Sequence, residues 1–462
     1  MAYRSINPFT GELLQSFGQH TDAQMESALA KAESTFQDVW SKATFLERAA
    51  IVSRAAALML ERKESLARLA ALEMGKRIAE GREEVEMSAA ILQYFAEHAE
   101  AFLAPEVIET TMGDAHLEFS PLGVLIGVQP WNFPYYQLAR FAGPNLMAGN
   151  VLLVKHSSTV PQCALAFEQL FADAAAPHGT YTNLFISSEQ VGRLLDDPRT
   201  TGVALTGSEQ AGESLASRAG KNLKRATMEL GGSDAFIVLD DCDLEFAVRM
   251  AVLGRIGNVG QTCIGAKRFI VVGPRAGQFL NAFRDALSQL KPGDPLDERT
   301  TLGPLASETS LKLLLKQVRE AVAHGARVFA GGDRIRHQGA FMQPTILTNV
   351  TPDNPVFRQE FFGPVALFFP ARDEEEAISI ANDSPLGLGG SVYTYDIKRG
   401  KQVASRIETG MVFVNYPFIS APELPFGGIK RSGYGKELSR LGIQEFVNKK
   451  LICARKPTTD EA

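Results

Sequence analysis

The chain has 462 residues, enough for two or three domains, because a single hydrophobic core rarely grows beyond about 250 to 300 residues. Apolar residues make up 45% and charged residues 22%, a balance typical of a globular protein rather than of a disordered chain. The formal net charge of -6 provides no basic field for nucleic acid or for an anionic membrane, so we expect neither as a partner.

The N-terminal segment lacks the apolar stretch of a signal peptide, and no segment reaches the roughly 18 apolar residues of a membrane span. Cys163, Cys242, Cys263 and Cys453 are widely spaced, and no pair has the C-x-x-C spacing of a zinc or redox motif. We therefore expect a cytoplasmic protein with reduced thiols and no bound metal.

The first hundred residues have the pattern of helices. Thr21 and Thr44 each begin a capping box, in which Gln or Glu follows three residues later. Apolar residues recur at helical spacing after both, which predicts helices over residues 22–38, 45–75 and 79–103.

From residue 123 onward, short apolar runs alternate with helical segments. The runs predict strands at 124–128, 151–154, 203–205, 235–239 and 269–272. Strands that alternate with helices form parallel sheets through right-handed crossovers. The sequence therefore predicts an α/β protein with two doubly wound parallel sheets, of which the second begins after Gly231.

Two further predicted strands, at 116–119 and 445–453, lie outside this alternation. An unpaired strand exposes backbone groups that another chain can pair with. We therefore expect these strands to form a small β element that pairs with a second copy of the chain.

One of the four cysteines lies in a distinctive stretch, Asn258-Val-Gly-Gln-Thr-Cys-Ile-Gly265. Its small neighbours allow backbone N–H groups to approach the sulfur of Cys263 and to lower the thiol pKa. An isolated cysteine is more often a small buried hydrophobic residue, so this stretch alone leaves both interpretations open.

A carboxylate in an apolar setting is a candidate partner for this thiol. Glu229 lies between Met228 and Leu230, surroundings that would raise its pKa and suit a general base near neutral pH. A structural ion pair with Lys224 or Arg225 is the alternative.

An asparagine follows the first predicted strand of the α/β region. Asn132 lies in Gln129-Pro-Trp-Asn-Phe-Pro134, at the carboxyl end of a strand, where ligands gather in parallel sheets. Its amide N–H could stabilise an oxyanion, and an Asx turn before Pro134 is the alternative.

A glycine turn and a helix start, Thr206-Gly-Ser-Glu209, follow the strand at 203–205. Backbone N–H groups in such a turn can hold a pyrophosphate. The segment lacks the G-x-G-x-x-G spacing, so taken alone it is more typical of a helix start without a ligand. Lys155 follows another strand and supplies a cation that could lie beside the turn.

Together and in this order, the motifs resemble those of the NAD(P)-dependent aldehyde dehydrogenases over about residues 5–455, and most of all those of the succinate semialdehyde dehydrogenases. The matching stretches are Pro130–Pro134, Val154–Lys155, Thr206–Ser208, Met228–Gly232, Gly260–Cys263, Glu360–Pro364, Pro425–Lys430 and Ser432–Glu437.

The resemblance implies a domain organisation. Residues 1–106 and 125–230 would form a dinucleotide-binding domain, and residues 231–425 a catalytic domain. Residues 107–124 and 438–462 would form an oligomerisation or bridging element of a homodimer or homotetramer.

The resemblance also implies the chemical roles. Cys263 would be the nucleophile, Glu229 the general base, Asn132 a donor of the oxyanion hole, and Glu437 a proton relay. The aldehyde would be oxidised through a thiohemiacetal and a thioester on the cysteine. The residues implied in cofactor binding are Trp131, Lys155, Ser158, Gly207, Ser208, Leu230, Glu360 and Phe362.

The prediction of the substrate rests on fewer residues than the prediction of the reaction. Arg140 resembles the arginine that anchors the substrate carboxylate in succinate semialdehyde dehydrogenases, and Ser420 falls in the loop where that subfamily uses a serine. A salt bridge elsewhere is the alternative for Arg140. Gly257 stands where some members carry a second arginine, although Arg255 is near. We expect oxidation of succinate semialdehyde, a small aldehyde with a distal carboxylate, with other ω-acid semialdehydes or medium-chain aldehydes as alternatives.

Cofactor choice depends on Ser158, three positions after Lys155, where NAD-specific members often carry a glutamate. Without that carboxylate, nothing repels the 2′-phosphate of NADP, so we expect use of both NAD and NADP. A non-catalytic nucleotide-binding protein is the principal rival, and the joint presence of Cys263, Glu229 and Asn132 disfavours it.

Overall fold

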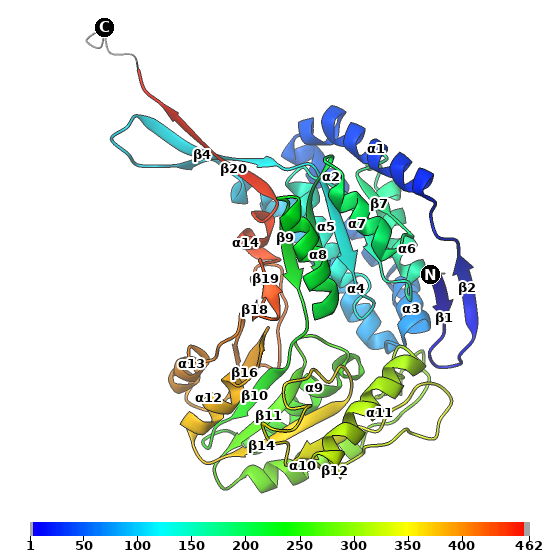
Figure 1. Ribbon diagram of the computed structural model, residues 1–462, viewed down its shortest axis with the longest axis vertical. Coiled ribbons are helices and arrows are strands. Elements are labelled where there is room, and N and C mark those ends of the chain that lie inside the picture. The colour runs from blue at the N-terminus through cyan, green and yellow to red at the C-terminus, as the bar shows by residue number, and fades with distance from the viewer. Residues whose placement is uncertain (1–2, 457–462) are drawn as a thin grey trace.

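A computed structural model of the protein describes residues 3–456. Residues 1–2 and 457–462, at the outer ends of the predicted domain ranges, lie outside the described residues. Two α/β lobes are stacked along the long axis, and a narrow β arm projects from the first lobe (Figure 1). Among the described residues, no helix is both long enough and apolar enough to cross a bilayer.

The chain begins with a hairpin of β1 (Tyr3–Ile6) and β2 (Leu13–Phe17), which is followed by a layer of helices. The helices are α1 (Asp22–Asp38), α2 (Phe45–Glu61), α3 (Lys63–Met74) and α4 (Ile78–Phe102), with a short 3-10 turn, η1 (Trp40–Lys42), after α1. The capping boxes at Thr21 and Thr44 are formed as predicted.

The single helix predicted over residues 45–75 is wrong, because the structure has two helices that meet at Arg62. Its backbone, at φ -103° and ψ 15°, leaves the helical region and redirects the chain. Both helices bury one face against α4, so the apolar periodicity continues across the break. For that reason the sequence pattern did not reveal the turn.

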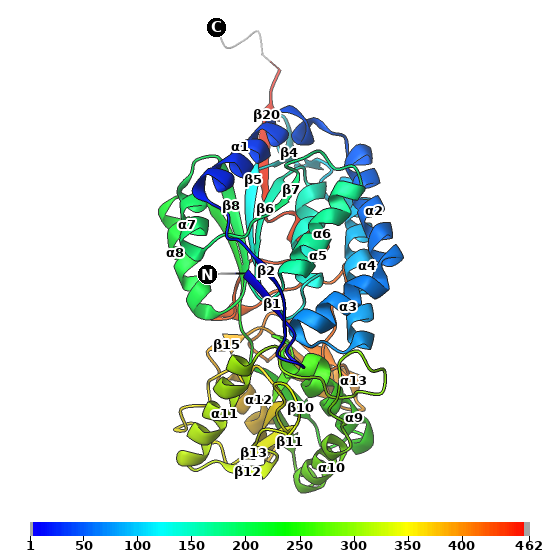
Figure 2. The same cartoon turned by 90° about the vertical axis from the view of Figure 1, so that its right-hand side faces the viewer.

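The first lobe contains a six-stranded sheet in the order β19-β9-β8-β5-β6-β7, parallel except for β19. Its strands are β5 (Val124–Gln129), β6 (Val151–His156), β7 (Tyr181–Asn183), β8 (Thr200–Thr206), β9 (Arg225–Glu229) and β19 (Gly433–Tyr434). The connecting helices are α5 (Tyr136–Met147), α6 (Pro161–Asp173), α7 (Ser188–Asp196) and α8 (Glu209–Lys221), and they cover both faces (Figure 2). The strand order reverses between β5 and β8, which is where ligands bind in such sheets.

The second lobe contains a seven-stranded sheet in the order β12-β13-β14-β11-β10-β16-β17, in which only β12 is antiparallel. Its strands are β10 (Asp234–Val238), β11 (Ala266–Val272), β12 (Arg327–Ala330), β13 (Thr345–Thr348), β14 (Val365–Ala371), β16 (Gly390–Tyr393) and β17 (Phe413–Val414). Its helices are α9 (Leu244–Ile256), η2 (Gly257–Gly260), α10 (Ala276–Ser288), α11 (Glu308–Ala323), α12 (Glu374–Asn382) and α13 (Ile397–Ala404). The predicted fold class is thereby confirmed.

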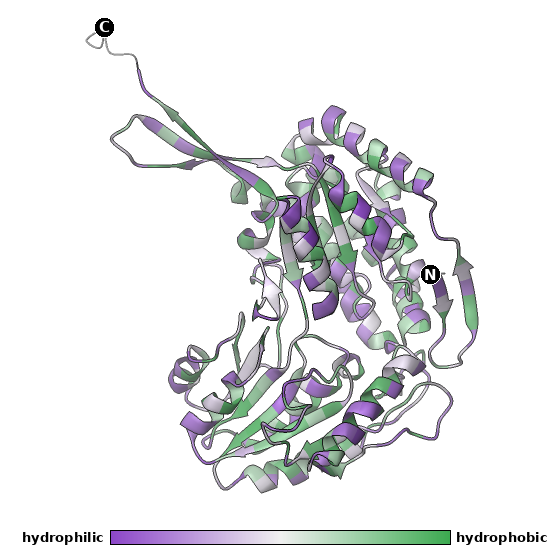
Figure 3. Ribbon diagram, viewed as in Figure 1, coloured by the Kyte–Doolittle hydropathy of each residue, from purple (hydrophilic) through white to green (hydrophobic). Residues whose placement is uncertain are grey.

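The central strands are buried on both faces. Every residue of β10 and of β11 is buried, as expected for parallel strands that have helices on each side. The ribbon of the strands inside the second lobe is coloured largely green, which marks hydrophobic residues (Figure 3). In the first lobe, a Cβ atom on Gly127 of β5 would lie 2.5 Å from the Phe141 ring, so this glycine lets α5 pack closely on the sheet.

The chain returns from the second lobe to the first near its C-terminus. Strand β18 (Ile429–Lys430) pairs with β15 (Leu386–Gly387) of the second lobe, and β19 then pairs with β9 of the first. In this register Gly433 is opposite Glu229. Residues 426–437, which the predicted domain ranges leave unassigned, therefore contact both lobes.

The projecting arm consists of β3 (Glu106–Val107), β4 (Asp114–Pro121) and β20 (Val447–Ala454), in the order β20-β4-β3. The two strands predicted at 116–119 and 445–453 are both present, but they pair with each other, as in Leu117 opposite Leu451. Their pairing with a second copy of the chain stays a prediction. Only the tertiary fold brings these distant segments together.

Candidate functional site

Cys263 lies between η2 and β11, after a turn with unusual backbone angles. Asn258 and Val259 adopt left-handed conformations at φ 52° and 56°, a region that asparagine tolerates and valine rarely enters. A Cβ atom on Gly260, at φ 75°, would lie 2.5 Å from the Gly363 carbonyl oxygen. This constrained turn presents the half-buried Cys263 side chain at the edge of the second lobe.

Asn132 lies in the loop between β5 and α5 and is nearly fully buried. Its Nδ2 donates to the Gln261 carbonyl oxygen at 3.0 Å, and Nδ2 of Asn258 donates to the Asn132 carbonyl oxygen at 2.8 Å. These bonds join the Asn132 loop to the loop that carries Cys263. An amide nitrogen has two N–H groups, so Asn132 has one left for an oxyanion.

Glu229 is the last residue of β9 and is 2% exposed. Among the described residues, neither carboxylate oxygen has a hydrogen-bond partner. Burial and then the nearby Glu437 carboxylate raise the pKa of Glu229 to about 8. Gly427 leaves it room, since a Cβ atom there would lie 2.6 Å from Oε1 of Glu229. This carboxyl group therefore becomes a base just above neutral pH.

Arg140 lies on α5 and is 1% exposed. Its guanidinium forms an ion pair with Glu437, and Nη2 donates to Oγ1 of Thr206 at 3.2 Å. Its charge also acts on Glu229 and on Cys263. The salt-bridge alternative for this arginine is thus present in the structure, and the same side chain links three of the predicted catalytic residues.

Two hydroxyl groups extend the Arg140 cluster. Oη of Tyr136 lies 2.6 Å from Oγ of Ser420, and Nη1 of Arg140 donates to the same Tyr136 oxygen at 3.4 Å. The sequence did not single out Tyr136, because its partner is 284 residues away along the chain. Arg255, by contrast, is fully buried and donates to backbone carbonyls of Ala266 and Gly260, so it does not replace the missing second arginine.

The predicted contacts for the adenosine and diphosphate gather at the ends of β6 and β8. Ser208 caps α8, with Oγ accepting from the Ala211 N–H at 3.4 Å, and Gly207 precedes it. Burial lowers the pKa of the Lys155 ammonium, and no carboxylate within residues 3–456 forms an ion pair with it. A half-buried cation and a helix N-terminus at the same edge of the sheet suit an anionic dinucleotide.

The predicted contacts for the nicotinamide ribose and ring lie between the lobes. Oε1 of Glu360 accepts from the Gly232 N–H at 3.2 Å. The rings of Trp131 and Phe362 meet edge to face at 5.8 Å between centroids. Leu230, directly after Glu229, donates its N–H to the Ser432 carbonyl oxygen at 3.0 Å.

The sequence profile of the aldehyde dehydrogenase family matches residues 1–452. The chain belongs to this family. A relative from Deinococcus radiodurans, named succinate-semialdehyde dehydrogenase (NADP+), is 48% identical over 452 residues, which cover 98% of this chain and 94% of the relative.

Solved structures of aldehyde dehydrogenases have the same fold. The succinic semialdehyde dehydrogenase of Streptococcus pyogenes, in complex with NADP+, is 43% identical, with a TM-score of 0.97 over 98% of this chain and 100% of that one. The betaine aldehyde dehydrogenase of Staphylococcus aureus, in complex with NAD+, is 29% identical, with a TM-score of 0.96 over 100% of this chain and 93% of that one.

Sequence reasoning missed a lysine behind the nucleophile of this aldehyde dehydrogenase. Nζ of Lys267 donates to the carbonyl oxygens of Thr262 at 2.7 Å and Cys263 at 2.5 Å, and lies 3.3 Å from Oε1 of Glu360. The expected lowering of the Cys263 thiol pKa is not found, because burial raises this pKa to about 11, while Arg140 and Lys267 act in the opposite direction. Two adjacent basic residues, Lys267 and Arg268, at the start of the otherwise apolar strand β11 were the signal that could have revealed it.

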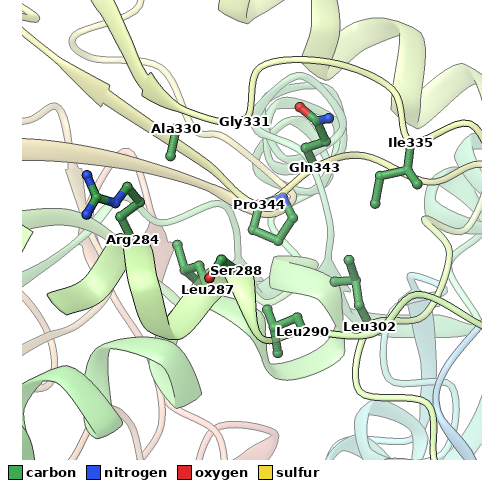
Figure 4. A pocket seen from close by; sticks show the side chains of 10 residues that line it. All are labelled: Arg284, Leu287, Ser288, Leu290, Leu302, Ala330, Gly331, Ile335, Gln343 and Pro344. Carbon is green, nitrogen blue, oxygen red and sulfur yellow. The ribbon is translucent and has the colours of Figure 1, made fainter. Parts of the chain in front are cut away.

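The hollow in Figure 4 is separate from this site. It has a volume of about 320 Å³ and lies between α10 and the β12–β13 edge of the second lobe. None of the predicted site residues lines it. Within residues 3–456, no group of three or more His, Cys, Asp or Glu side chains could hold a metal ion.

The raised pKa of Glu229 leads to a prediction about Glu437. The change Glu437→Gln removes the neighbouring negative charge and leaves Arg140 without its counter-ion, and both effects favour ionised Glu229. The deacylation rate should rise as Glu229 loses its proton, and we expect this ascending limb of the pH–rate profile, with a midpoint near pH 8, to move to lower pH. The measurement is the rate of thioester hydrolysis as a function of pH. The exposed Glu375→Gln is the matched control, and an unchanged or higher midpoint for Glu437→Gln would contradict the assignment.

Proposed function

We propose that this aldehyde dehydrogenase oxidises succinate semialdehyde to succinate. The observation that carries the proposal is the cluster of Tyr136 and Ser420 hydroxyls beside the Arg140 guanidinium, whose charge also acts on Cys263. Hydroxyl groups and a cation are suitable partners for a distal carboxylate. The printed names of the relatives from Deinococcus radiodurans and Streptococcus pyogenes agree with this substrate.

In the first half of the reaction, the Cys263 thiolate adds to the aldehyde carbon and a C–S bond forms. The negative charge moves to the former carbonyl oxygen, where the free N–H of Asn132 and the Cys263 backbone N–H stabilise it. Re-formation of the carbonyl requires a hydride to leave, and the oxidised nicotinamide of a cofactor held beside Phe362 and Trp131 would accept it. A thioester on Cys263 remains.

In the second half, Glu229 removes a proton from water, and the oxygen attacks the thioester carbon. The C–S bond breaks, the thiolate is restored and the carboxylic acid is released. Glu437 lies near Glu229 and is placed to receive the proton that Glu229 takes up. A raised pKa of Glu229 lets it hold that proton and then lose it near neutral pH.

The cofactor site is proposed to accept both NADP and NAD. Lys155 and the N-terminus of α8 would hold the phosphates, and Ser158 adds no negative charge near the ribose. Glu360 would bind the nicotinamide ribose, with Phe362, Trp131 and Leu230 lining the ring. Solved relatives bind NADP+ in one case and NAD+ in another.

Removing one hydroxyl tests the substrate proposal. The change Tyr136→Phe should lower kcat/KM for succinate semialdehyde by about tenfold or more, because a hydrogen bond to a charged group contributes about 1.5 to 3 kcal/mol. For butanal, which has no distal carboxylate, kcat/KM should stay within about twofold. The measurement is steady-state kinetics with both aldehydes.

The exposed tyrosine change Tyr395→Phe is the matched control and should leave both rates unaltered. An equal fall for the two aldehydes in Tyr136→Phe would remove the carboxylate assignment while leaving the dehydrogenase chemistry in place. A wild-type ratio near one between the two aldehydes would favour the medium-chain alternative.

Placing a carboxylate at the ribose tests the cofactor proposal. The change Ser158→Glu should lower kcat/KM for NADP by about tenfold or more through repulsion of the 2′-phosphate, while NAD stays within a few-fold. Ser158→Ala is the control of similar size without charge. For the wild-type enzyme, a preference of roughly a thousandfold for either cofactor, about 4 kcal/mol, would overturn dual use.

The proposal extends to assembly and location. The predicted dinucleotide-binding and catalytic domains are proposed to correspond to the first and second lobes, and the arm of β3, β4 and β20 is proposed to join subunits of a homodimer or homotetramer. The arm projects away from the first lobe (Figure 3), and it exposes Val107, Met112 and Leu451 by 60% or more. The four cysteines are unpaired, which fits a reducing cytoplasm.

A charge on the arm tests this assembly. The change Leu451→Glu should reduce the molar mass measured by light scattering at low protein concentration, because a buried unpaired carboxylate disfavours the interface. The control is Leu313→Glu, which alters an exposed leucine on α11. An unchanged mass in Leu451→Glu, or a monomeric wild-type protein, would contradict the role of the arm.

A further inference from the structure

The oxyanion loop, defined here as residues 129–136, starts at the end of β5 and runs into the first turn of α5. It carries Asn132 at its centre. The first N–H groups of a helix have no partner within the helix and need acceptors from elsewhere. Tyr135, the residue at the N-cap of α5, provides no side-chain cap.

Glu84 of α4 supplies the missing acceptor. Its Oε1 accepts from the backbone N–H of Tyr135 at 2.8 Å and from that of Tyr136 at 3.1 Å. Its Oε2 forms an ion pair with Lys76, and the side chains of both are at most 1% exposed. A single carboxylate thus fixes the end of the oxyanion loop by two charge-assisted bonds.

Lys76 contacts the same loop next to Asn132. Its Nζ lies 3.7 Å from the centroid of the Phe133 ring, a cation–π contact. The buried pair therefore contacts Phe133, which follows Asn132, and the start of α5 at Tyr135 and Tyr136. No residue of the pair belongs to a motif that the sequence singled out.

A stabilising role alone does not account for such a pair. Removing two charges from water is costly, and a well-packed apolar pair of similar size is often as stable or more stable. An apolar pair has no oxygen to accept the two N–H groups. Glu84 therefore differs from an apolar residue in that its two hydrogen bonds fix the position of the loop backbone.

We propose that Glu84, balanced by Lys76, is a positioning residue that keeps Asn132 aligned with the oxyanion that forms at Cys263. The inference rests on the proposed role of Asn132 in the oxyanion hole. Glu84 acts through the backbone of the loop and does not touch the substrate. A displacement of a catalytic group by about 1 Å can cost on the order of a hundredfold in rate.

Two double variants separate the hydrogen bonds from the charges. Lys76→Met with Glu84→Gln removes the ion pair but keeps an oxygen that can accept from the two N–H groups. Lys76→Met with Glu84→Leu removes the ion pair and the acceptor together. Both variants avoid leaving one buried charge without its partner.

The measurement is the single-turnover rate of NADPH formation at saturating succinate semialdehyde and NADP+. We expect the variant with glutamine to stay within about threefold of wild type and the variant with leucine to fall by about ten- to a hundredfold. Alkylation of Cys263 by iodoacetamide forms no oxyanion, so its rate should stay within about twofold in both. Equal rates of NADPH formation in the two variants would overturn the proposal.

A purely structural role would lower the melting temperature of the leucine variant and alter alkylation and turnover together, which would also overturn the proposal. The change Asn132→Ala separates a failure of the proposed role of Asn132 from a failure of the proposed role of Glu84. If it leaves the single-turnover rate intact, the proposed role of Asn132 fails. If it slows the rate, adding it to the leucine variant should cause little further loss, because both changes act on one interaction.

Discussion

The two carboxylates of the site depend on one buried guanidinium, that of Arg140. Arg140 has almost no contact with water, and it contacts Glu437 directly while Glu229 lies farther from its charge. Burial raises the pKa of both carboxyl groups, and the Arg140 guanidinium counteracts this for Glu437. Glu229, which lacks such a partner, is left with a pKa of about 8. The Arg140 guanidinium thus opposes the effect of burial on the pKa of both carboxyl groups, and it forms an ion pair with Glu437.

This arrangement requires both lobes and the returning C-terminal segment. Glu229 comes from a strand of the first lobe, Cys263 from a turn of the second, and Glu437 from the segment that pairs with both. Asn132 and Asn258 join the two loops by hydrogen bonds. The reacting groups are therefore held in register by backbone carbonyls and amides, which have fewer alternative positions than long side chains.

Buried charged residues outside the recognised motifs support the reacting groups from behind. Lys267 ties the carbonyl of Cys263 to Glu360, and the pair of Lys76 and Glu84 holds the loop of Asn132. Each contributes hydrogen bonds with fixed direction at a place where an apolar side chain would only fill space. Rigid support of this kind keeps donors aimed at a charge before that charge develops.

The sequence by itself determined the fold class, the family and the order of the motifs, because hydrophobic periodicity and short motifs are local properties of the chain. It also identified the types of residue that the chemistry needs, such as Cys263 and Glu229. Only the tertiary structure decided that Arg140 pairs with Glu437, that Tyr136 meets Ser420, and that the two arm strands pair with each other. These are contacts between segments hundreds of residues apart, and no local pattern encodes them. The break at Arg62 was hidden for a related reason, since two helices that bury the same face repeat the same apolar spacing.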